Sequence, residues 1–271
     1  MRYRTGRAVA AATLLVAVLS ACQSTTMGGA VGASRKQLLL VSSQEVNAGS
    51  AQAYRQTLTE AKSKRTLNTN AAYTRRVKEI SARLIRQVLV FRPEARDWQW
   101  EVNVFTSPEV NAYCMPGGKI GIYTGIIDQL QLNDDELAAV IGHEIAHALR
   151  EHSREKISQK VAQQQGLALV GALAGLSQGQ MDMANLAGQY AVTLPFSRSM
   201  ESEADVMGLE LMARAGYNPA AAPNVWRKMA KLGEGGPEFL STHPSGSTRI
   251  AELSARIPQV MPLYEEARRK R

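Results

Sequence analysis

Long apolar runs and aromatic residues are both scarce in this sequence. Its two apolar stretches, residues 8–19 and 167–176, are shorter than the roughly 20 residues that a helix needs to cross a bilayer. Aromatic residues make up only 6% of the chain, and none is interleaved with the basic run at residues 268–271. This run is typical of a solvated chain end, so we expect no nucleic-acid partner.

The N-terminus has the pattern of a lipoprotein signal peptide. A basic start precedes the first apolar run, and Leu19-Ser20-Ala21-Cys22 resembles the bacterial lipobox, at which the cysteine is lipidated and the chain is cut just before it. Gln23 stands where an inner-membrane retention signal would have Asp, so the resemblance points to the periplasmic side of the outer membrane. The alternative is an ordinary secretory peptide with an incidental cysteine.

Cysteine is scarce as well, since the chain has only two. Once Cys22 is lipidated, Cys114 has no partner, so we expect no internal disulfide and interpret Cys114 as a small buried hydrophobe. With 271 residues, 45% of them hydrophobic, the chain can bury one good core.

These observations predict three segments. Residues 1–21 form the signal peptide, residues 22–42 form a lipidated flexible tether, and residues 43–271 form a single domain. Within that domain we expect N-terminal helices over 43–96, a catalytic core over 97–257 and a basic tail over 258–271.

The central motif is His143-Glu144-Ile145-Ala146-His147, the H-E-x-x-H pattern of zinc hydrolases. Two histidines four residues apart lie nearly above one another on a helix, so both can bind one metal ion. Glu144 lies about 100° around the helix, where it can act as a general base on a water molecule at the metal without binding the metal itself. The alternative is a chance match on an amphipathic helix.

Local signals place this motif on a helix beside a small sheet. Asn133 and Glu136 have the spacing of a capping box, and apolar residues recur at helical spacing after them. Residues 98–105 alternate as a half-buried strand, and residues 111–123 predict a hairpin with a Pro-Gly-Gly turn. The strand beside the cleft, with Asn111, Ala112 and Tyr113, can hold an extended substrate by strand addition, although a purely structural hairpin is an equal alternative.

Zinc needs a further protein ligand, and the segment 197–205 offers one. Glu201 and Asp205 lie one turn apart on a predicted helix that ends near Gly216, so Glu201 can bind the metal while Asp205 accepts a ring N–H from a ligating histidine. Glu203 is the fallback ligand. His152 lies about 140° from His147 on a continuous helix, which makes it a poor ligand.

The set of motifs resembles family 48 of the metallopeptidases. It comprises Asn111-Ala112 with Pro116-Gly117-Gly118, the H-E-x-x-H motif, Ser197-Arg198-x-x-Glu201-x-Glu203-Ala204-Asp205, and Thr242-His243-Pro244 with Arg249-Ile250. These motifs span residues 107–253, and the lipobox is similar to that of the small lipoprotein members. The resemblance implies His143, His147 and Glu201 as ligands of one zinc ion, Glu144 as base, and a gluzincin fold of the α+β class that is mostly helical with a small sheet beside the metal helix.

Two residues near the end of the motif set have open roles. If the family arrangement holds, His243 either stabilises the developing oxyanion or occupies the open zinc position at rest, and otherwise it is a structural loop residue. Arg249 is either a charge stabiliser or a salt-bridge partner. Residues 167–176 are best explained as a buried Gly/Ala helix, and residues 178–185 could form a lid over the cleft.

The sequence therefore predicts a zinc metalloendopeptidase of the periplasm, anchored to the outer membrane through Cys22. We expect it to cleave misfolded or misassembled envelope proteins, with the outer-membrane assembly machinery as a further partner. One alternative is a chaperone or assembly factor that keeps the zinc fold but acts by binding. Another is a structural lipoprotein with a vestigial site.

Overall fold

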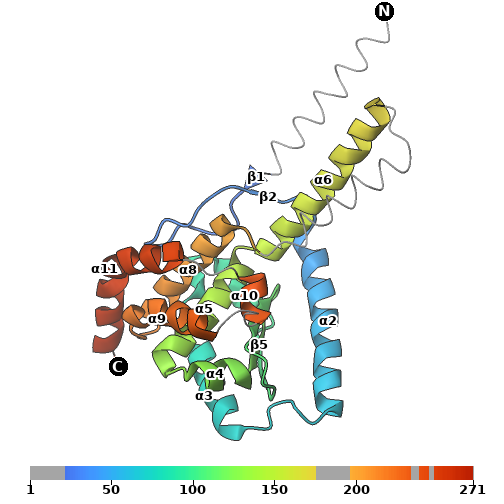
Figure 1. Ribbon diagram of the computed structural model, residues 1–271. Coiled ribbons are helices and arrows are strands. Elements are labelled where there is room, and N and C mark those ends of the chain that lie inside the picture. Colours follow the sequence, from blue (N-terminus) through green and yellow to red (C-terminus); the bar gives the residue numbers. More distant parts are fainter. Residues whose placement is uncertain (1–21, 175–195, 233–237, 244–246, 271) are drawn as a thin grey trace, which may run out of the picture.

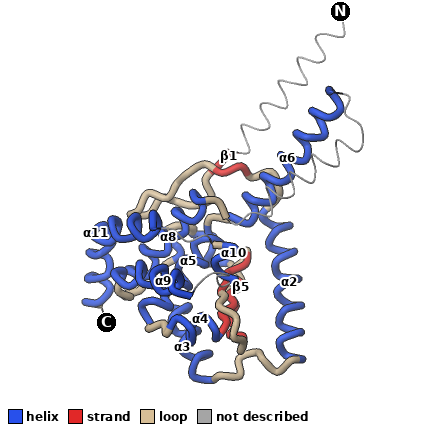
Figure 2. Tube along the Cα trace, viewed as in Figure 1, coloured by secondary structure: helices blue, strands red, loops and turns tan. Residues whose placement is uncertain are grey.

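The computed structural model describes residues 22–174, 196–232, 238–243 and 247–270. The predicted signal peptide and the predicted lid at 178–185 lie outside these residues, as does the end of the apolar stretch 167–176. In the described part, helices surround one small three-stranded sheet (Figures 1 and 2). This mostly helical α+β architecture confirms the predicted fold class. No described helix combines the length and the apolar character needed to cross a membrane.

Side-chain caps mark where several helices begin, since Ser42, Asn70, Asn133 and Ser197 each accept a backbone N–H of the helix that follows. The larger ones are α2 (Ser43–Ser63), α3 (Ala71–Ile85), α4 (Thr124–Leu130), α5 (Asp134–Leu149), α6 (His152–Ala174), α8 (Arg198–Arg214), α9 (Ala222–Met229), α10 (Glu238–Thr242) and α11 (Ser247–Arg269). Short 3-10 turns occupy Val88–Val90, Pro93–Asp97, Pro219–Ala221 and Ala230–Leu232. Asn133 and Glu136 form the expected capping box at the start of α5, which fixes where this helix begins.

The main sheet has the order β3-β5-β4, with β3 (Glu101–Phe105) parallel to β5 (Lys119–Tyr123) and β4 (Ala112–Met115) antiparallel to it. Gly117 and Gly118 have φ values of 80° and 82°, which glycine adopts without strain, so they close the tight turn from β4 to β5. β3 is shorter than the predicted strand 98–105, because Trp98 closes a 3-10 turn through its N–H to Ala95 and the N–H of Trp100 bonds back to Trp98 instead of to the sheet. β4 lies at one edge of the sheet.

The core is centred on α5, which is buried along most of its length and packs against α3, α8, α9 and β4. Helices α5 and α8 approach closely where Gly142 faces Gly208. A Cβ on Gly142 would lie 3.0 Å from the carbonyl oxygen of Gly208, and a Cβ on Gly208 would lie 2.8 Å from the amide nitrogen of His143. These two helices carry the candidate metal ligands.

The segment predicted as a flexible tether instead packs on the core. Its first strand, β1 (Cys22–Gln23), pairs with β2 (Gln37–Leu38), and Val31, Ala33 and Leu39 are buried. The backbone N–H groups of Ala30 and Val31 donate to the carboxylate of Glu210 on α8. The Gly, Ser and Thr content suggested mobility, but the buried apolar residues and the bonds to α8 hold this segment in place.

The predicted basic tail also differs from what the structure shows. Residues 258–269 continue α11, and Val260 on this helix is fully buried. Pro258 and Pro262 lie inside α11, which bends in Figure 1, because each proline lacks the N–H for an intrahelical bond. The predicted boundary at residue 257 therefore falls within a continuous helix.

Candidate metal centre

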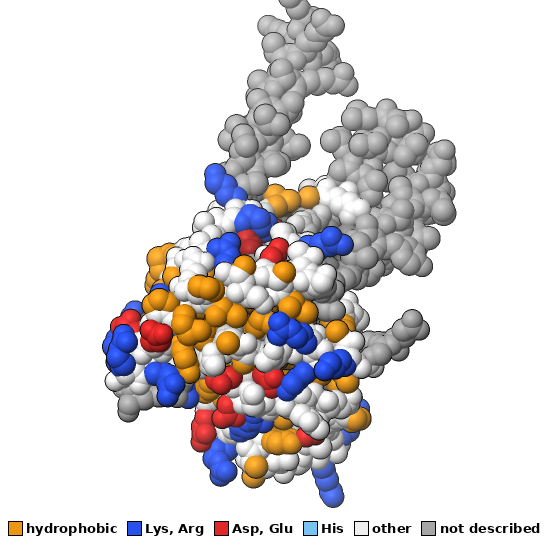
Figure 3. Space-filling model, turned by 60° about the vertical axis from the view of Figure 1, so that its left-hand side comes forward, with side chains coloured by type: hydrophobic (Ala, Val, Ile, Leu, Met, Phe, Trp, Pro, Cys, Tyr) orange, Lys and Arg blue, Asp and Glu red, His pale blue; other side chains and the backbone are white. Residues whose placement is uncertain are grey.

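All four histidines of the chain gather in one buried cluster. None is more than 4% exposed, and no histidine is visible on the face shown in Figure 3. His143 and His147 come from α5, with their Nε2 atoms 3.1 Å apart. His243 follows α10, and its Nδ1 lies 3.3 Å from Nε2 of His143. His152 lies on the other side of His147, at the start of α6.

Glu201 brings a carboxylate to this cluster from α8. Its Oε1 lies 3.3 Å from Nε2 of His147 and 3.0 Å from Nδ1 of His243, and its Oε2 lies 3.5 Å from Nε2 of His143. Burial alone would raise the pKa of Glu201, but the three histidines outweigh it and hold that pKa well below its usual range. The carboxylate is therefore ionised, as a metal ligand must be.

These four side chains form a group suited to one metal ion, since their ligand atoms all lie within 4.8 Å of one another. Tetrahedral zinc with bonds of about 2.0–2.2 Å places its ligand atoms about 3.3–3.6 Å apart. The separations of 3.1 to 3.5 Å among His143, His147 and Glu201 are close to that geometry. Two imidazoles and a carboxylate are also the donor set of known catalytic zinc sites. The residues present thus fit zinc.

The two α5 histidines have pKa values shifted in opposite directions. Burial lowers the pKa of His147 well below its usual value, so this imidazole is neutral and free to bind a metal. Burial also opposes charge on His143, but hydrogen bonds to Asp205 and Glu201 raise its pKa to about 9. The same carboxylates that favour a proton here favour a divalent cation in its place.

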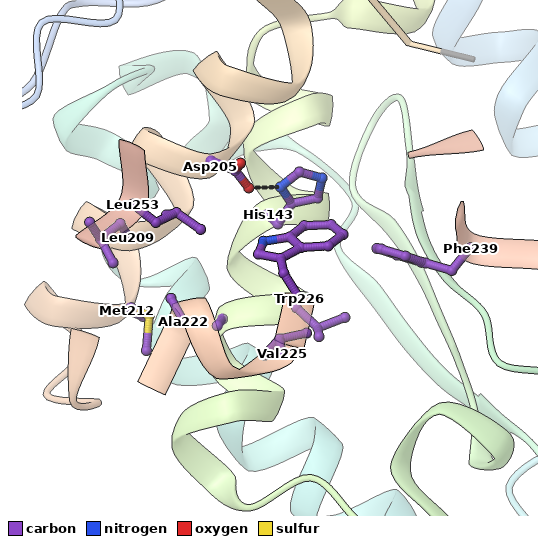
Figure 4. Close-up of a pocket in the computed structure, with 11 residues that line it drawn as sticks. His143, Asp205, Leu209, Met212, Ala222, Val225, Trp226, Phe239 and Leu253 are labelled. Carbon is purple, nitrogen blue, oxygen red and sulfur yellow. Dashed lines mark hydrogen bonds and ion pairs between the residues drawn. The ribbon is translucent and has the colours of Figure 1, made fainter. Parts of the chain in front are cut away.

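Asp205 holds His143 from the side away from the cluster. Its Oδ1 lies 3.0 Å from Nδ1 of His143, so Nδ1–H donates to the carboxylate and Nε2 is left for the metal (Figure 4). Arg249 donates to both oxygens of Asp205 at 2.7 Å and lies 2.6 Å from Oε2 of Glu201. Its guanidinium stacks 3.6 Å from the ring of Trp226. Arg249 is thus the salt-bridge partner of two buried carboxylates.

Glu144 faces the cluster from the adjacent position on α5. Burial raises the pKa of Glu144, an effect that His243 and His143 partly oppose. The backbone of Cys114 on β4 hydrogen-bonds to this carboxylate, whereas its Oε1 has no hydrogen-bond partner among the described residues. Nε2 of His243 lies 3.6 Å from this Oε1 atom. A general base needs a carboxylate oxygen that is free to accept a proton beside the metal-binding group, and Oε1 of Glu144 meets this requirement.

His152 and Glu203 lie behind His147, as Asp205 lies behind His143, and the sequence does not predict this arrangement. The prediction for His152 assumed a continuous helix, but α5 ends at Leu149 and Glu151 has a φ of 50°, so α6 starts in a new direction. Nδ1 of His152 consequently lies 2.9 Å from Nδ1 of His147, and its Nε2 lies 3.1 Å from Oε2 of Glu203. Neither His152 nor Glu203 belongs to the metal-binding group.

The cluster opens into a cleft of about 740 Å³ between β4 and α2. Asn111, Ala112 and Tyr113 line it on the sheet side with Cys114, and Val46, Gly49 and Ala53 line it on the α2 side. Glu144, His147 and His243 lie at its inner end. Cys114 is buried, as predicted, and is not in a disulfide. The sheet edge, the candidate base and two members of the metal-binding group, His147 and His243, therefore line one cleft.

Comparison with known proteins gives a consistent result. Residues 71–257 match peptidase family M48. The mitochondrial metalloendopeptidase OMA1 of Arabidopsis thaliana is 41% identical over 171 residues, which cover 62% of this chain and 34% of that protein. The metalloprotease LoiP of Escherichia coli is 29% identical over 258 residues, covering 93% of this chain and 96% of LoiP. The beta-barrel assembly-enhancing protease of Escherichia coli is 29% identical over 175 residues, covering 60% and 36%. The chain spans half or less of the length of the OMA1 relatives that it matches.

Proposed function

The chain belongs to peptidase family M48, and from this membership we propose that it is a zinc-dependent endopeptidase of the bacterial envelope. We assign His143, His147 and Glu201 as the zinc ligands. The single observation that carries this assignment is the buried group of two imidazoles and a carboxylate, near tetrahedral spacing, at the inner end of an open cleft.

We assign Glu144 as the general base. Zinc, when bound, supplies positive charge that makes a water molecule acidic and polarises the scissile carbonyl. Glu144 takes a proton from the attacking water as the new C–O bond forms. It then delivers that proton to the amine as the C–N bond breaks. Its raised pKa supports this role because a carboxylate that holds a proton more readily is a stronger base.

We propose that His243 occupies the fourth metal position in the resting protein. Its Nδ1 lies among the three ligands, while its other ring nitrogen faces the base Glu144. A ring in this place excludes water and substrate, so His243 must withdraw before cleavage. Phe239 stacks on the His243 ring with centroids 4.6 Å apart and holds it in the site.

Substrate binding is proposed to use the free edge of β4. In the sheet order β3-β5-β4, one side of β4 pairs with β5 and the other borders the cleft. An extended peptide can add to this edge along Asn111, Ala112 and Tyr113, with its side chains between the sheet and α2. Only a segment without fixed tertiary structure fits such a slot, which favours misfolded or misassembled proteins as substrates.

For the location we propose lipid attachment at Cys22 and the periplasmic side of the outer membrane. The lipobox-like sequence at residues 19–22 supports this, because acyl chains on a cysteine give a durable anchor. The match to LoiP, which covers nearly the whole length of both proteins, supports a metalloprotease but does not bear on its location. Labelling cells with a radioactive fatty acid should mark the wild-type chain and leave Cys22→Ser unlabelled.

The test of the peptidase proposal compares wild type with Glu144→Gln, using the mature chain. Each protein is analysed for zinc and incubated with an unfolded reporter protein such as reduced casein. We expect about one zinc per chain in both proteins and cleavage only by the wild type. Equal cleavage by Glu144→Gln would contradict the assignment of the base, and wild type without zinc would contradict the metal centre.

A second function, assembly by binding, is favoured by one relative, whose name describes a beta-barrel assembly-enhancing protease. The cleft between β4 and α2 could hold an extended client segment without cleaving it. If binding alone matters, cells carrying Glu144→Gln should assemble outer-membrane proteins normally, whereas cells lacking the chain should not. A defect in both strains would favour proteolysis.

A further inference from the structure

Among the described residues, no carboxylate or carbonyl oxygen is hydrogen-bonded to Nδ1 of His147, the ring nitrogen that points away from the metal-binding group. Histidines that bind metals usually donate this N–H to such an acceptor, which fixes the tautomer and the orientation of the ring. His143 follows this pattern through Asp205. Nδ1 of His147 instead lies 2.9 Å from Nδ1 of a second imidazole, that of His152. Both rings are buried, at 4% and 0% exposure.

The positions of the hydrogens follow from this contact. If Nε2 of His147 binds zinc, its Nδ1 carries the proton and donates to Nδ1 of His152. The hydrogen of His152 must then be on Nε2, 3.1 Å from Oε2 of Glu203, which accepts it. His147 is thus connected through one neutral imidazole to the carboxylate of Glu203, whose side chain is 11% exposed. This chain of donors requires the Glu203 carboxylate to stay in place.

Two arginines hold Glu203. Nη2 of Arg150, a fully buried residue, donates to Oε1 of Glu203 at 2.9 Å. Arg35 donates to both oxygens of Glu203, at 3.1 and 3.0 Å, and its remaining donors reach both oxygens of Glu155 at 2.7 and 2.9 Å. Such two-point contacts between a guanidinium and a carboxylate fix direction as well as charge.

Arg35 belongs to the N-terminal segment 24–39, which lies outside the match to the peptidase family. This segment reaches the site through a second side chain as well. Gln37, only 1% exposed, donates to the carbonyl of Arg150 at 2.6 Å and to Glu155 at 2.8 Å. The segment therefore contacts the backbone of Arg150 and the carboxylates of both Glu203 and Glu155.

We propose that Arg35, Glu203 and His152 are positioning residues for the zinc ligand His147, so that zinc affinity depends on the docking of segment 24–39 against the core. This inference rests on the proposed zinc site. Both α5 ligands would then be held by the same device, a carboxylate fixed by arginine: Asp205 with Arg249 for His143, and Glu203 with Arg35 and Arg150 for His147. The carboxylate behind His147 is thus held partly by Arg35 of the N-terminal segment.

The test measures zinc dissociation constants by competition with a coloured chelator, together with the urea midpoint of each metal-free protein. The variants are Arg35→Ala and Lys36→Ala in the full mature chain. Lys36 is the adjacent residue, its side chain is exposed, and its removal changes the net charge by the same amount. Support from beyond the ligands commonly contributes 10–100-fold to metal affinity. We expect Arg35→Ala to bind zinc at least about 10-fold more weakly and Lys36→Ala to match wild type.

Two variants of His152 separate positioning from general packing. In His152→Asn the amide oxygen can take the place of Nδ1 and accept from His147, whereas His152→Leu offers no acceptor. We expect zinc affinity to fall in the order wild type, Asn, Leu, and the visible spectrum of cobalt-loaded protein to shift in the same order. These variants also decide the question if Arg35→Ala does not fold.

The measurements distinguish a wrong inference about His147 positioning from the absence of a zinc site. If Arg35→Ala lowers the urea midpoint but binds zinc within twofold of Lys36→Ala, or if the Asn and Leu variants bind zinc as wild type does, the inference is wrong and Arg35 only attaches the segment. If wild type binds no zinc, the proposed function fails and this inference fails with it.

Discussion

Gly208 of α8 lies so close to α5 that a Cβ at this position would be 2.8 Å from the amide nitrogen of His143. The atoms that block it are backbone atoms, which cannot rotate away as a side chain can. The contact sets the distance between the helix that carries His143 and His147 and the helix that carries Glu201 and Asp205. A residue without a side chain thus controls the geometry of the metal-binding group.

Gly208→Ala should separate the two helices and weaken zinc binding. Inside a helix, Gly to Ala ordinarily stabilises by about 0.5–1 kcal/mol, but overpacking against backbone costs about 1–3 kcal/mol. We expect net destabilisation and a clear loss of zinc affinity. Gly49→Ala on α2 is the matched control, since nothing lies within 4 Å of its added Cβ. It should be neutral or slightly stabilising in urea unfolding; equal effects of the two changes would contradict the packing argument.

Asp205→Ala should damage both stability and metal binding. It leaves the buried Arg249 without its two-point partner and Nδ1 of His143 without its acceptor. Removing one partner of a buried ion pair costs about 3–5 kcal/mol, and loss of such a support weakens metal binding about 10–100-fold. Urea unfolding and chelator competition measure the two effects. The control Glu60→Ala breaks the exposed pair of Glu60 with Lys64 and should change neither.

His243→Ala tests the resting fourth ligand. Because three ligands remain, the variant should keep one zinc per chain, with weaker affinity. Removal of the ring opens the position that water and substrate require, so cleavage of an unfolded reporter should be as fast as in wild type or faster. A fall in kcat of about 100-fold with unchanged KM would instead assign His243 to stabilising the transition state.

Glu151 gives a prediction for pH. This carboxylate is 3% exposed at the break between α5 and α6. Burial favours its neutral form, but Arg92, Ser43 and Arg154 outweigh that effect and lower its pKa below the usual 4.5. Because the pKa of Glu151 is lower in the folded protein than in the unfolded chain, its ionised form stabilises the fold at pH values above the unfolded-state pKa. This stabilisation is lost as the pH falls through the folded-state pKa.

Glu151→Gln should therefore lower the urea midpoint of the metal-free protein at pH 7, and the gap to wild type should narrow below about pH 4.5. The exposed Glu265→Gln serves as control and should leave the urea midpoint at pH 7 close to that of wild type. A gap for Glu151→Gln that stays constant down to pH 3 would contradict the lowered pKa.

Local patterns in the sequence predict several elements. The spacing of Asn133 and Glu136 predicts the start of α5, and the Pro-Gly-Gly turn predicts the hairpin of β4 and β5. Helical periodicity places Glu201 and Asp205 on one face of α8, which is the face that meets the histidines. These predictions succeed because each depends on residues within one or two turns of each other.

Other features depend on contacts between distant segments and could not be predicted this way. The parallel pairing of β3 with β5 leaves no local pattern, nor does the burial of Arg150. The contact of Arg35 with Glu203 comes from a segment whose composition predicts a mobile tether. Nothing in the sequence marks Glu151 as a residue of positive φ, so the sequence predicts one continuous helix through His152, whereas α5 ends at Leu149.

A crystal structure of the zinc-loaded protein, with diffraction data collected on both sides of the zinc absorption edge, would show directly whether His143, His147 and Glu201 bind zinc. We expect one anomalous peak per chain, about 2.0–2.2 Å from Nε2 of His143, Nε2 of His147 and a carboxylate oxygen of Glu201. A peak bound elsewhere, or no peak in crystals grown with zinc, would contradict the metal centre and the peptidase proposal together.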